Sequence, residues 1–337
     1  MSYAFPGAFP GRRLRRVRRH DFSRRLVAEN VLTVDDLIYP VFVMEGKNHQ
    51  EEVSSMPGVH RMTIDLLVKE AEAIAKLGVP VLSLFPVIGT DKKSLHAEEA
   101  YNPDGLVQRA VRALKDAVPE LGLLTDVALD PYTTHGQDGI IDADGYVIND
   151  ITKEILVRQA LSHAEAGAEI IAPSDMMDGR IGAIRDQLEA QQMVNTQIMA
   201  YSAKYASCYY GPFRDAAGSA PSFGDRKSYQ MDFHNRREGM KEALTDVEEG
   251  ADIIMVKPAM SYLDMVSEVS KAVNVPVATY SVSGEYAMVK AAAKMGWIDE
   301  ERIMCEMAVS AYRAGAQIYL TYYAKELAKC MDEGRIG

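Results

Sequence analysis

Two lysines stand near the ends of two similar apolar segments, AYSAKYAS with Lys204 and MVKPAM with Lys257. If these segments are neighbouring strands, each ammonium group disfavours the charge of the other, and removal from water acts in the same direction. At least one amine is then partly neutral near pH 7, and a neutral amine attacks carbonyl groups to form a Schiff base. A single lysine near a strand end is more often a solvated cap, but the pair predicts covalent carbonyl chemistry.

The segment between the lysines, residues 209–232, is rich in glycine, serine, arginine and aromatic residues. It is too irregular to form only a crossover helix, so we expect a lid over the site. Its cationic side chains Arg214, Arg226 and Lys227 could hold a carboxylate through hydrogen bonds while closure excludes water. The alternative is a solvent-exposed charged loop.

Hydroxyl groups end two later apolar segments, in SVSGEY (281–286) and TYYAK (321–325). In many barrel enzymes this corner binds phosphate through glycine-rich backbone. One glycine with several hydroxyls, among them those of Ser283 and Tyr322, suits a carboxylate better. The residues alone therefore predict an enzyme that traps carbonyl groups on lysines and binds carboxylates.

Eight short apolar segments recur along the chain with amphipathic helical patterns between them, as parallel strands with helical crossovers require. They are residues 37–44, 79–87, 123–130, 169–176, 196–205, 252–260, 275–284 and 317–325. Several follow a glycine that ends a helical pattern, in KLGVPV, EAGAEI, EEGADI and RAGAQI. This rhythm predicts a (β/α)8 TIM barrel, with a doubly wound open sheet as the alternative. We favour the barrel because polar residues end the strands, and a barrel brings those ends to one mouth.

The composition, 47% hydrophobic and 25% charged residues in a chain of 337, is typical of a soluble globular protein. The sequence has no run long enough to span a membrane and no secretory signal pattern, so we expect a cytoplasmic protein without a membrane partner. Cys208, Cys305 and Cys330 lie far apart. Their spacing indicates neither a disulfide framework nor a cysteine zinc site.

The first 30 residues differ in charge from the rest of the chain. Eight arginines against Asp21 and Glu29 give this part +6, which leaves −17 for the remainder of a chain whose net charge is −11. Because the body is acidic and carries no nucleic-acid motif, we expect the arm to contact a neighbouring subunit and expect no nucleic-acid partner. We therefore divide the chain into an oligomerisation arm, residues 1–33, and a catalytic barrel, residues 34–337. A solvated tail or a nucleic-acid-binding arm stays the alternative.

Several motifs together resemble the porphobilinogen synthase family, also called 5-aminolaevulinic acid dehydratase. They are SMPGVHR (55–61), AYNPDG (100–105), TDVALDPYTTHGQDG (125–139), APSDMMDGR (172–180), AYSAKYAS, GPFRDA (211–216), MVKP, VSGEY and TYYAK. The resemblance covers nearly the whole chain after the arginine-rich arm. It implies a lyase that condenses two 5-aminolaevulinate molecules, with loss of two waters, into porphobilinogen for tetrapyrrole (haem) biosynthesis.

The resemblance also implies a role for each matching residue. The substrate on the propionate side would contact Lys257, Tyr280, Ser283 and Tyr322. The substrate on the acetate side would contact Lys204, Arg214, Arg226 and Gln230. Asp126 and Ser174 would assist proton transfer. A carboxylate beside the lysines can move protons during Schiff-base formation and in the final deprotonation. For Asp126 the alternative is a structural, salt-bridged carboxylate.

Zinc-dependent members of the family carry three cysteines in the loop 125–139, where this chain has Ala128, Asp130 and Asp138. Zinc favours thiolate and imidazole, whereas two carboxylates and an alanine offer hard oxygen ligands and an incomplete shell. The loop thus argues against a tight catalytic zinc. It leaves Asp130 and Asp138 for proton transfer or for a loosely held, hydrated Mg²⁺. His135 in this loop is more simply a hydrogen-bonded residue than a ligand.

The resemblance implies an allosteric Mg²⁺ at Glu242, within the acidic helical pattern 237–252. Without the resemblance this pattern is most simply a solvated face. The family's usual assembly, an octamer of dimers that embrace through their arms, would bring a neighbour's arm near Glu242. An effect of a monovalent cation stays open. So do two rival functions, an aldolase with a single reactive lysine and a non-enzymatic barrel whose arm binds RNA.

Overall fold

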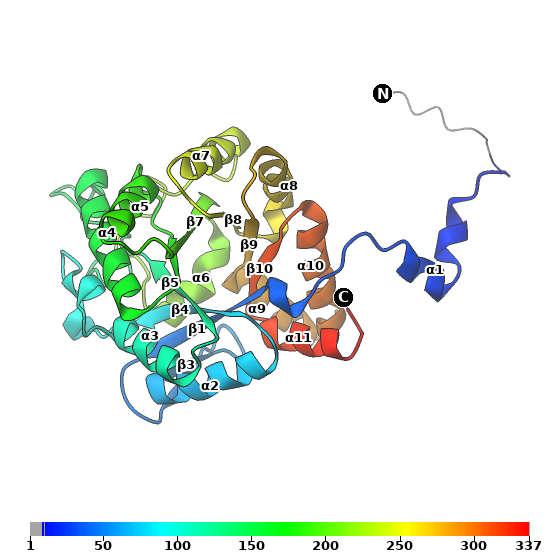
Figure 1. Ribbon diagram of the computed structural model, residues 1–337, viewed down its shortest axis with the longest axis horizontal. Coiled ribbons are helices and arrows are strands. Elements are labelled where there is room, and N and C mark those ends of the chain that lie inside the picture. Colours follow the sequence, from blue (N-terminus) through cyan, green and yellow to red (C-terminus); the bar gives the residue numbers. More distant parts are fainter. Residues whose placement is uncertain (1–8, 10, 337) are drawn as a thin grey trace.

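The computed structural model describes residue 9 and residues 11–336, and within them eight parallel strands close into a barrel surrounded by helices (Figure 1). The barrel strands are β1 (Leu37–Met44), β4 (Val81–Val87), β5 (Gly122–Val127), β6 (Ile170–Pro173), β7 (Gln197–Lys204), β8 (Ile253–Lys257), β9 (Val277–Ser281) and β10 (Ile318–Thr321). They pair in chain order, and β10 pairs with β1 to complete the ring. The predicted (β/α)8 TIM barrel is confirmed, and the open sheet is wrong.

Several predicted segments run past the strands that they contain. The segment 123–130 overlaps β5, which ends at Val127, and the segment 275–284 overlaps β9, which ends at Ser281. Asp130 therefore lies in the turn after its strand, and Ser283 begins a helix. The strand ends were misjudged because the residues that follow are also buried, so burial does not mark where the ladder stops.

Nine longer helices cover the outside of the barrel in the part of the chain that the structure describes. They are α2 (Ile64–Lys76), α3 (Leu106–Ala117), α4 (Asn149–Ala166), α5 (Arg180–Ala190), α7 (Arg236–Glu248), α8 (Leu263–Ala272), α9 (Ser283–Lys294), α10 (Glu300–Ala314) and α11 (Ala324–Asp332). The glycines expected to end helices have positive φ angles of 83°, 110°, 102° and 117°, at Gly78, Gly167, Gly250 and Gly315. Glycine adopts this region without steric cost, so each helix stops there and the chain turns into the next strand.

The strands of the barrel are buried on both faces. Every residue of β1, β6, β8 and β9 is buried. This pattern is typical of parallel strands that have helices on one side and packed side chains on the other. Asp126, Lys204 and Lys257, at or near the C-terminal ends of their strands, are accordingly held in a water-poor environment.

A buried arginine joins the helices to the barrel on one side. Arg180, at the start of α5, is 2% exposed and donates to Asp246 of α7 at 3.0 Å and to the carbonyl of Tyr201 in β7 at 3.2 Å. Its Nε lies 3.6 Å from the carboxylate of Asp175. An isolated buried cation is costly, so these partners fix α5 and α7 relative to β7.

An antiparallel hairpin is added to the barrel between its first and second strands. Its strands are β2 (Gln50–Glu52) and β3 (His60–Thr63), and β3 also pairs with the last residues of β1. The motif SMPGVHR forms the turn and the start of β3. The hairpin thus lies beside the last residues of β1, whereas β10 pairs with the first residues of that strand.

The basic arm stands apart from the barrel in Figure 1. Its described part contains the short helices η1 (Leu14–Arg18) and α1 (Asp21–Leu26), and no residue of either is buried. Residues 1–8 and 10 of the predicted arm lie outside the described residues, and the boundary after residue 33 stays a prediction. Among the described helices, none combines the length and the apolar character needed to cross a membrane.

Candidate active site

Lys204 and Lys257 are direct register partners on the adjacent parallel strands β7 and β8. Only 4% of Lys204 and 6% of Lys257 is exposed. The register shifts between Tyr201 and Ala203, so one extra residue of β7 is accommodated just before the lysines become partners. This bulge re-aims the end of β7 and brings two like charges together in a buried place.

Burial lowers the pKa of Lys257 to about 7, and the charge of Lys204 acts in the same direction. Burial also lowers the pKa of Lys204, although the carboxylates of Asp138 and Asp126 oppose this. Lys257 thus loses its proton far more readily than an ordinary lysine does. This agrees with the expectation that one amine of the pair is a nucleophile at neutral pH.

Four aromatic rings surround the amine of Lys257. Its Nζ lies 4.6 Å from the ring centre of Tyr280, 5.0 Å from those of Tyr201 and Tyr210, and 5.4 Å from that of Phe213. The rings exclude water and present faces that attract a cation. Tyr201 and Tyr210 were missed in the sequence, where an aromatic residue in an apolar segment has the pattern of ordinary core.

Asp126, in β5, is the carboxylate most suited to exchange a proton with the lysines. Burial raises its pKa to about 7, against the opposing effects of the Lys204 charge and the Ser174 hydroxyl. Its Oδ1 is buried without a hydrogen-bond partner among the described residues. The Nζ of Lys204 donates to the carbonyl of Ser174, which fixes that amine on the same side of the barrel mouth. The pKa values of Asp126 and Lys257 are both about 7, so a proton can pass between this carboxyl group and this amine in either direction at neutral pH.

Asp130 and Asp138 have different partners although they share one loop. Arg226 donates from Nη2 to Asp130 at 3.0 Å. Burial alone would raise the pKa of Asp130, but Arg226 and Lys204 bring it below the ordinary value. Burial raises the pKa of Asp138, and the charge of Asp130 adds to the effect. Asp130 is thus a fixed anion, whereas Asp138 is held toward its neutral form.

Few donor atoms of Ala128, Asp130 and Asp138 are free to bind a metal ion. Ala128 offers no donor atom, and Asp130 already pairs with Arg226. Oδ1 of Asp138 accepts from the backbone N–H of Leu129 at 2.7 Å, which leaves only its second oxygen. These are oxygen donors engaged elsewhere, whereas a catalytic zinc site needs three protein ligands. Nδ1 of His135 accepts from the N–H of Gln137 at 3.1 Å.

The segment 209–232 crosses the barrel mouth with η5 (Cys208–Tyr210), α6 (Gly211–Ala217) and then irregular chain. Gln230 is 2% exposed, and neither its amide oxygen nor its amide nitrogen has a partner in the described chain. Nε of Arg214 and Nε of Arg226 are also buried without partners there. Unsatisfied buried donors are costly, so this cluster indicates a place for a polar ligand. Lys227 does not join it, because 69% of its side chain is exposed.

The hydroxyl groups expected to bind a carboxylate are already hydrogen bonded. The hydroxyls of Tyr280 and Tyr322 lie 3.0 Å apart. Oγ of Ser283 accepts from the N–H of Phe213 at 2.9 Å and donates to the carbonyl of Tyr209 at 3.1 Å. A hydroxyl has one proton, so Ser283 can donate to a ligand only if its bond to Tyr209 breaks.

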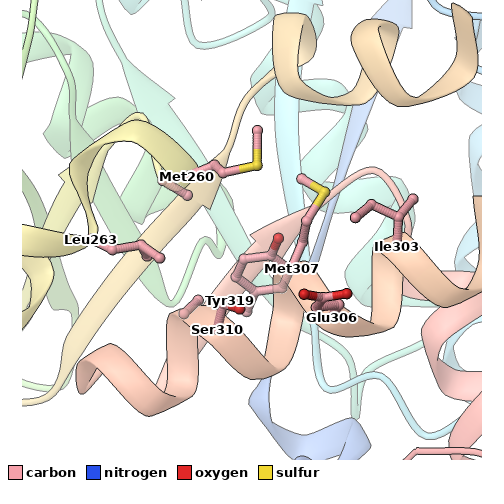
Figure 2. Close-up of a pocket in the computed structure, with 9 residues that line it drawn as sticks. Met260, Leu263, Ile303, Glu306, Met307, Ser310 and Tyr319 are labelled. Carbon is pink, nitrogen blue, oxygen red and sulfur yellow. The ribbon is translucent and has the colours of Figure 1, made fainter. Parts of the chain in front are cut away.

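A separate cavity of about 130 Å³ lies between α8 and α10, outside the barrel mouth (Figure 2). Its wall is mostly apolar and includes Met260, Leu263, Ile303 and Met307. Glu306 is the carboxylate that lines it. No lysine lines this cavity, and Glu306 and Tyr319 are the titratable residues in its wall, so it offers no amine for the carbonyl chemistry that the lysine pair suits.

The neutral amine of Lys257 can be detected by reductive methylation with formaldehyde and a borane. Because only the neutral amine reacts, we expect the methylation rate at Lys257 to reach half of its maximum near pH 7. For an ordinary lysine the half-maximal rate falls at about pH 10. Peptide mass spectrometry follows each lysine in one sample. Lys204→Met removes a like charge and should move the midpoint upward. Lys92 is an internal control, because its hydrogen bond to Glu45 raises its pKa. A midpoint near pH 10 at Lys257 would contradict the assignment.

The chain is similar over nearly its whole length to one group of enzymes. A sequence model of delta-aminolevulinic acid dehydratase matches residues 11–330. The dehydratase of Bradyrhizobium diazoefficiens is 52% identical over 318 residues, which are 94% of this chain and 90% of that protein. The dehydratase of Synechococcus elongatus is 52% identical over 324 residues, 95% of this chain and 99% of that protein.

A solved structure extends the similarity to three dimensions. The delta-aminolevulinic acid dehydratase (porphobilinogen synthase) of Toxoplasma gondii, in complex with its reaction product porphobilinogen, superposes with a TM-score of 0.94. It is 48% identical in sequence and covers 96% of this chain and 92% of its own. With the buried lysine pair at the mouth of the same barrel, these findings show that the chain belongs to the delta-aminolevulinic acid dehydratase family of lyases.

Proposed function

We propose that the two buried lysines trap two molecules of 5-aminolaevulinate as Schiff bases, and that the site joins them into porphobilinogen for tetrapyrrole (haem) biosynthesis. The observation that carries this proposal is the direct pairing of Lys204 with Lys257, together with the pKa of about 7 at Lys257. Two keto acids need two carbonyl traps, and an aldolase with one reactive lysine does not need the second. Each neutral amine adds to a keto carbon, and loss of water from the adduct gives the imine.

We propose that the propionate-side substrate sits on Lys257, within the ring cluster of Tyr280 and Phe213. Its carboxylate would receive hydrogen bonds from Ser283 and Tyr322. This requires Ser283 to exchange its bond to the lid carbonyl of Tyr209 for one to the substrate. Substrate binding on this side is therefore coupled to a local movement of the segment 209–213.

The acetate-side substrate would then be bound to Lys204. The unpartnered amide of Gln230 and the free Nε atoms of Arg214 and Arg226 support a carboxylate contact here, because each is a buried donor without an acceptor. Asp130 holds Arg226 in place through their ion pair. Asp126 would carry protons during Schiff-base formation and in the last deprotonation, with Ser174 beside it and Asp138 as a second acid.

We propose a magnesium-type enzyme that lacks the cysteine zinc site. The zinc loop offers Ala128 and two engaged carboxylates instead of thiolates. Glu242 on α7 is half-buried, and burial raises its pKa, with the charges of Asp246 and Asp178 adding to the effect against Arg180. A hydrated Mg²⁺ needs only one or two carboxylates and would relieve this repulsion. We assign no residue to a monovalent cation.

We propose that the arm docks on a neighbouring subunit in a homo-octamer that is built from dimers, and that it does not bind nucleic acid. The arm combines arginines with exposed apolar side chains, including Leu14 at 64%, Phe22 at 63% and Leu26 at 80% exposure. Apolar groups of this kind are suited to a protein surface, and the acidic body offers charge complementarity. A cytoplasmic location stays a prediction, with which three free cysteines agree.

Borohydride trapping tests the lysine assignment. With 5-aminolaevulinate present, reduction should leave covalent adducts on both Lys204 and Lys257, and replacement of either lysine by methionine should reduce pyrrole formation to background. Asp126→Asn should lower kcat by about 10²–10⁴-fold, because proton transfer slows. Peptide mass spectrometry and a colorimetric pyrrole assay measure the two effects. Lys227→Met is the matched control, since this exposed lid lysine should be dispensable. An adduct on one lysine only, without pyrrole, would favour the aldolase.

Chelation and metal addition test the metal proposal. Activity should survive a zinc-selective chelator and should rise with Mg²⁺, and Glu242→Ala should lose the response to Mg²⁺ while keeping both Schiff-base adducts. Steady-state assays over a Mg²⁺ series measure this. Glu248→Ala changes an exposed carboxylate on the same helix and should keep the response. Strict zinc dependence would overturn the proposal.

Removal of residues 1–30 tests the arm. The truncated chain should form smaller assemblies and have lower activity, because the apolar and cationic groups that join subunits are lost. Light scattering after size exclusion measures the assembly. A second variant, Phe22→Ser with Leu26→Ser, keeps every charge and should weaken assembly through its apolar part alone. Intact assembly with loss of salt-sensitive RNA binding would favour the nucleic-acid alternative.

A further inference from the structure

The hairpin β2–β3 contacts the C-terminal end of α6, the short helix of the segment 209–232. Arg61 of β3 donates from Nε to the carbonyl of Ala216 and from Nη2 to the carbonyl of Asp215, both at 2.7 Å. The hydroxyl of Ser55 in the hairpin turn donates to the carboxylate of Asp215, also at 2.7 Å. The last carbonyls of a helix have no partner within the helix. Arg61 supplies a donor to the carbonyl of Ala216 and a second donor to the carbonyl of Asp215, which also accepts from the N–H of Gly218 at 3.3 Å.

A second cation approaches the same helix end from the loop after β4. Nζ of Lys93 donates to the carbonyl of Gly218 at 2.7 Å. Gly218 ends α6 with a φ of 59°, in the left-handed region. Cations at the C-terminal end of a helix are favourable because the carbonyl dipoles point toward them. Arg61 and Lys93 therefore hold one helix end from two separate parts of the barrel.

The hairpin is itself fixed to the barrel. The hydroxyl of Tyr286 in α9 donates to the carbonyl of Pro57 at 2.7 Å. Val53 is 1% exposed and Met56 is not exposed at all, so the turn is anchored by packing. By contrast, α6 has seven residues, too few to be stable as a helix without outside contacts. The hairpin is therefore anchored to the barrel, and α6 depends on its contacts with the hairpin for its position.

The held helix carries two groups of the proposed site. Phe213 lies 5.4 Å from Nζ of Lys257 by its ring and binds Ser283 through its backbone N–H. Arg214 follows it and has a buried Nε without a partner in the described chain. If α6 turned or moved away, both groups would leave the lysine pair together, because they are adjacent in one short helix.

We propose that Arg61 and Lys93 are positioning residues that hold α6 closed over the lysine pair and so set Phe213 and Arg214 for substrate binding. This inference rests on the proposed function, because it uses the carboxylate-binding role of Arg214. The lysines are buried, so substrate enters only when the segment opens. Loss of a holding contact lowers the fraction of closed enzyme and raises KM by the same factor. When substrate saturates the enzyme, its carboxylate holds Arg214 in place. The decrease in kcat is therefore smaller than the increase in KM.

Two variants, Arg61→Gln and Lys93→Met, test the proposal in the full chain. In each, amide hydrogen exchange of residues 211–217 in the free enzyme should become faster. KM for 5-aminolaevulinate should rise about tenfold in Arg61→Gln, where both hydrogen bonds to α6 are lost together with the ion pair to Glu51, and less in Lys93→Met. The change in kcat should stay within about twofold, since substrate restores closure. Arg61→Lys keeps the charge but not the two-pronged geometry and should be intermediate.

The chain offers a matched control for each variant. Arg185 has a side chain of similar exposure, 17% against 21% for Arg61, and also donates to two carbonyls, those of Thr196 and Gly250. Lys115 donates to the carbonyl of Pro119 at 2.7 Å. Arg185→Gln and Lys115→Met remove comparable bonds away from α6. We expect neither to change the exchange of residues 211–217 or KM.

The outcomes separate this inference from the function on which it rests. Unchanged exchange in residues 211–217 of both test variants would overturn the holding role. Faster exchange with an unchanged KM would overturn the positioning role. If the unaltered enzyme formed no adduct on Lys257, the proposed function would fail, while the exchange measurement would still decide whether Arg61 and Lys93 hold α6.

Discussion

The structure depends on keeping two lysines side by side in a place that excludes water. Two ammonium groups in such a place repel each other and lose their hydration, so the free energy is lower when one of them releases its proton. The fold arranges this by pairing Lys204 with Lys257 across adjacent strands that helices cover on the outside. The closed barrel therefore lowers the pKa of a residue that is normally charged.

The carboxylates at the barrel mouth limit how far this repulsion goes. Asp126 and Asp138 stabilise the charge of Lys204, while burial keeps both carboxyl groups closer to neutral than usual. Asp130 stays charged because Arg226 lies against it. The segment 125–139 thus contains one member of an ion pair and two carboxyl groups whose pKa values burial raises. These groups are suited to acid–base work, which a family of dehydrating lyases requires.

Residues 209–217, which lie over the lysines, are held by side chains that are far away in the sequence. Arg61 binds the carbonyl of a residue 155 positions later, and Ser283 binds the backbone at Tyr209, 74 positions earlier. Both contacts end on the same short stretch of chain. This stretch has little stability of its own, so its neighbours decide whether the lysines face water or an enclosed, largely aromatic space.

The sequence by itself determined the repeating strands and helices, the glycines that end helices, and the two lysines with the loop between them, because these follow from local periodicity and backbone preference. Places at strand ends indicated Asp126, Ser174, Ser283 and Tyr322, whereas Arg214 and Arg226 came from the composition of the segment 209–232, and Gln230 and Tyr280 from the family resemblance. Only the tertiary structure decided the bulge after Tyr201, the ion pair of Asp130 with Arg226, and the rings of Tyr201 and Tyr210 around Lys257. These depend on strand register and barrel closure, which join residues that no local pattern relates.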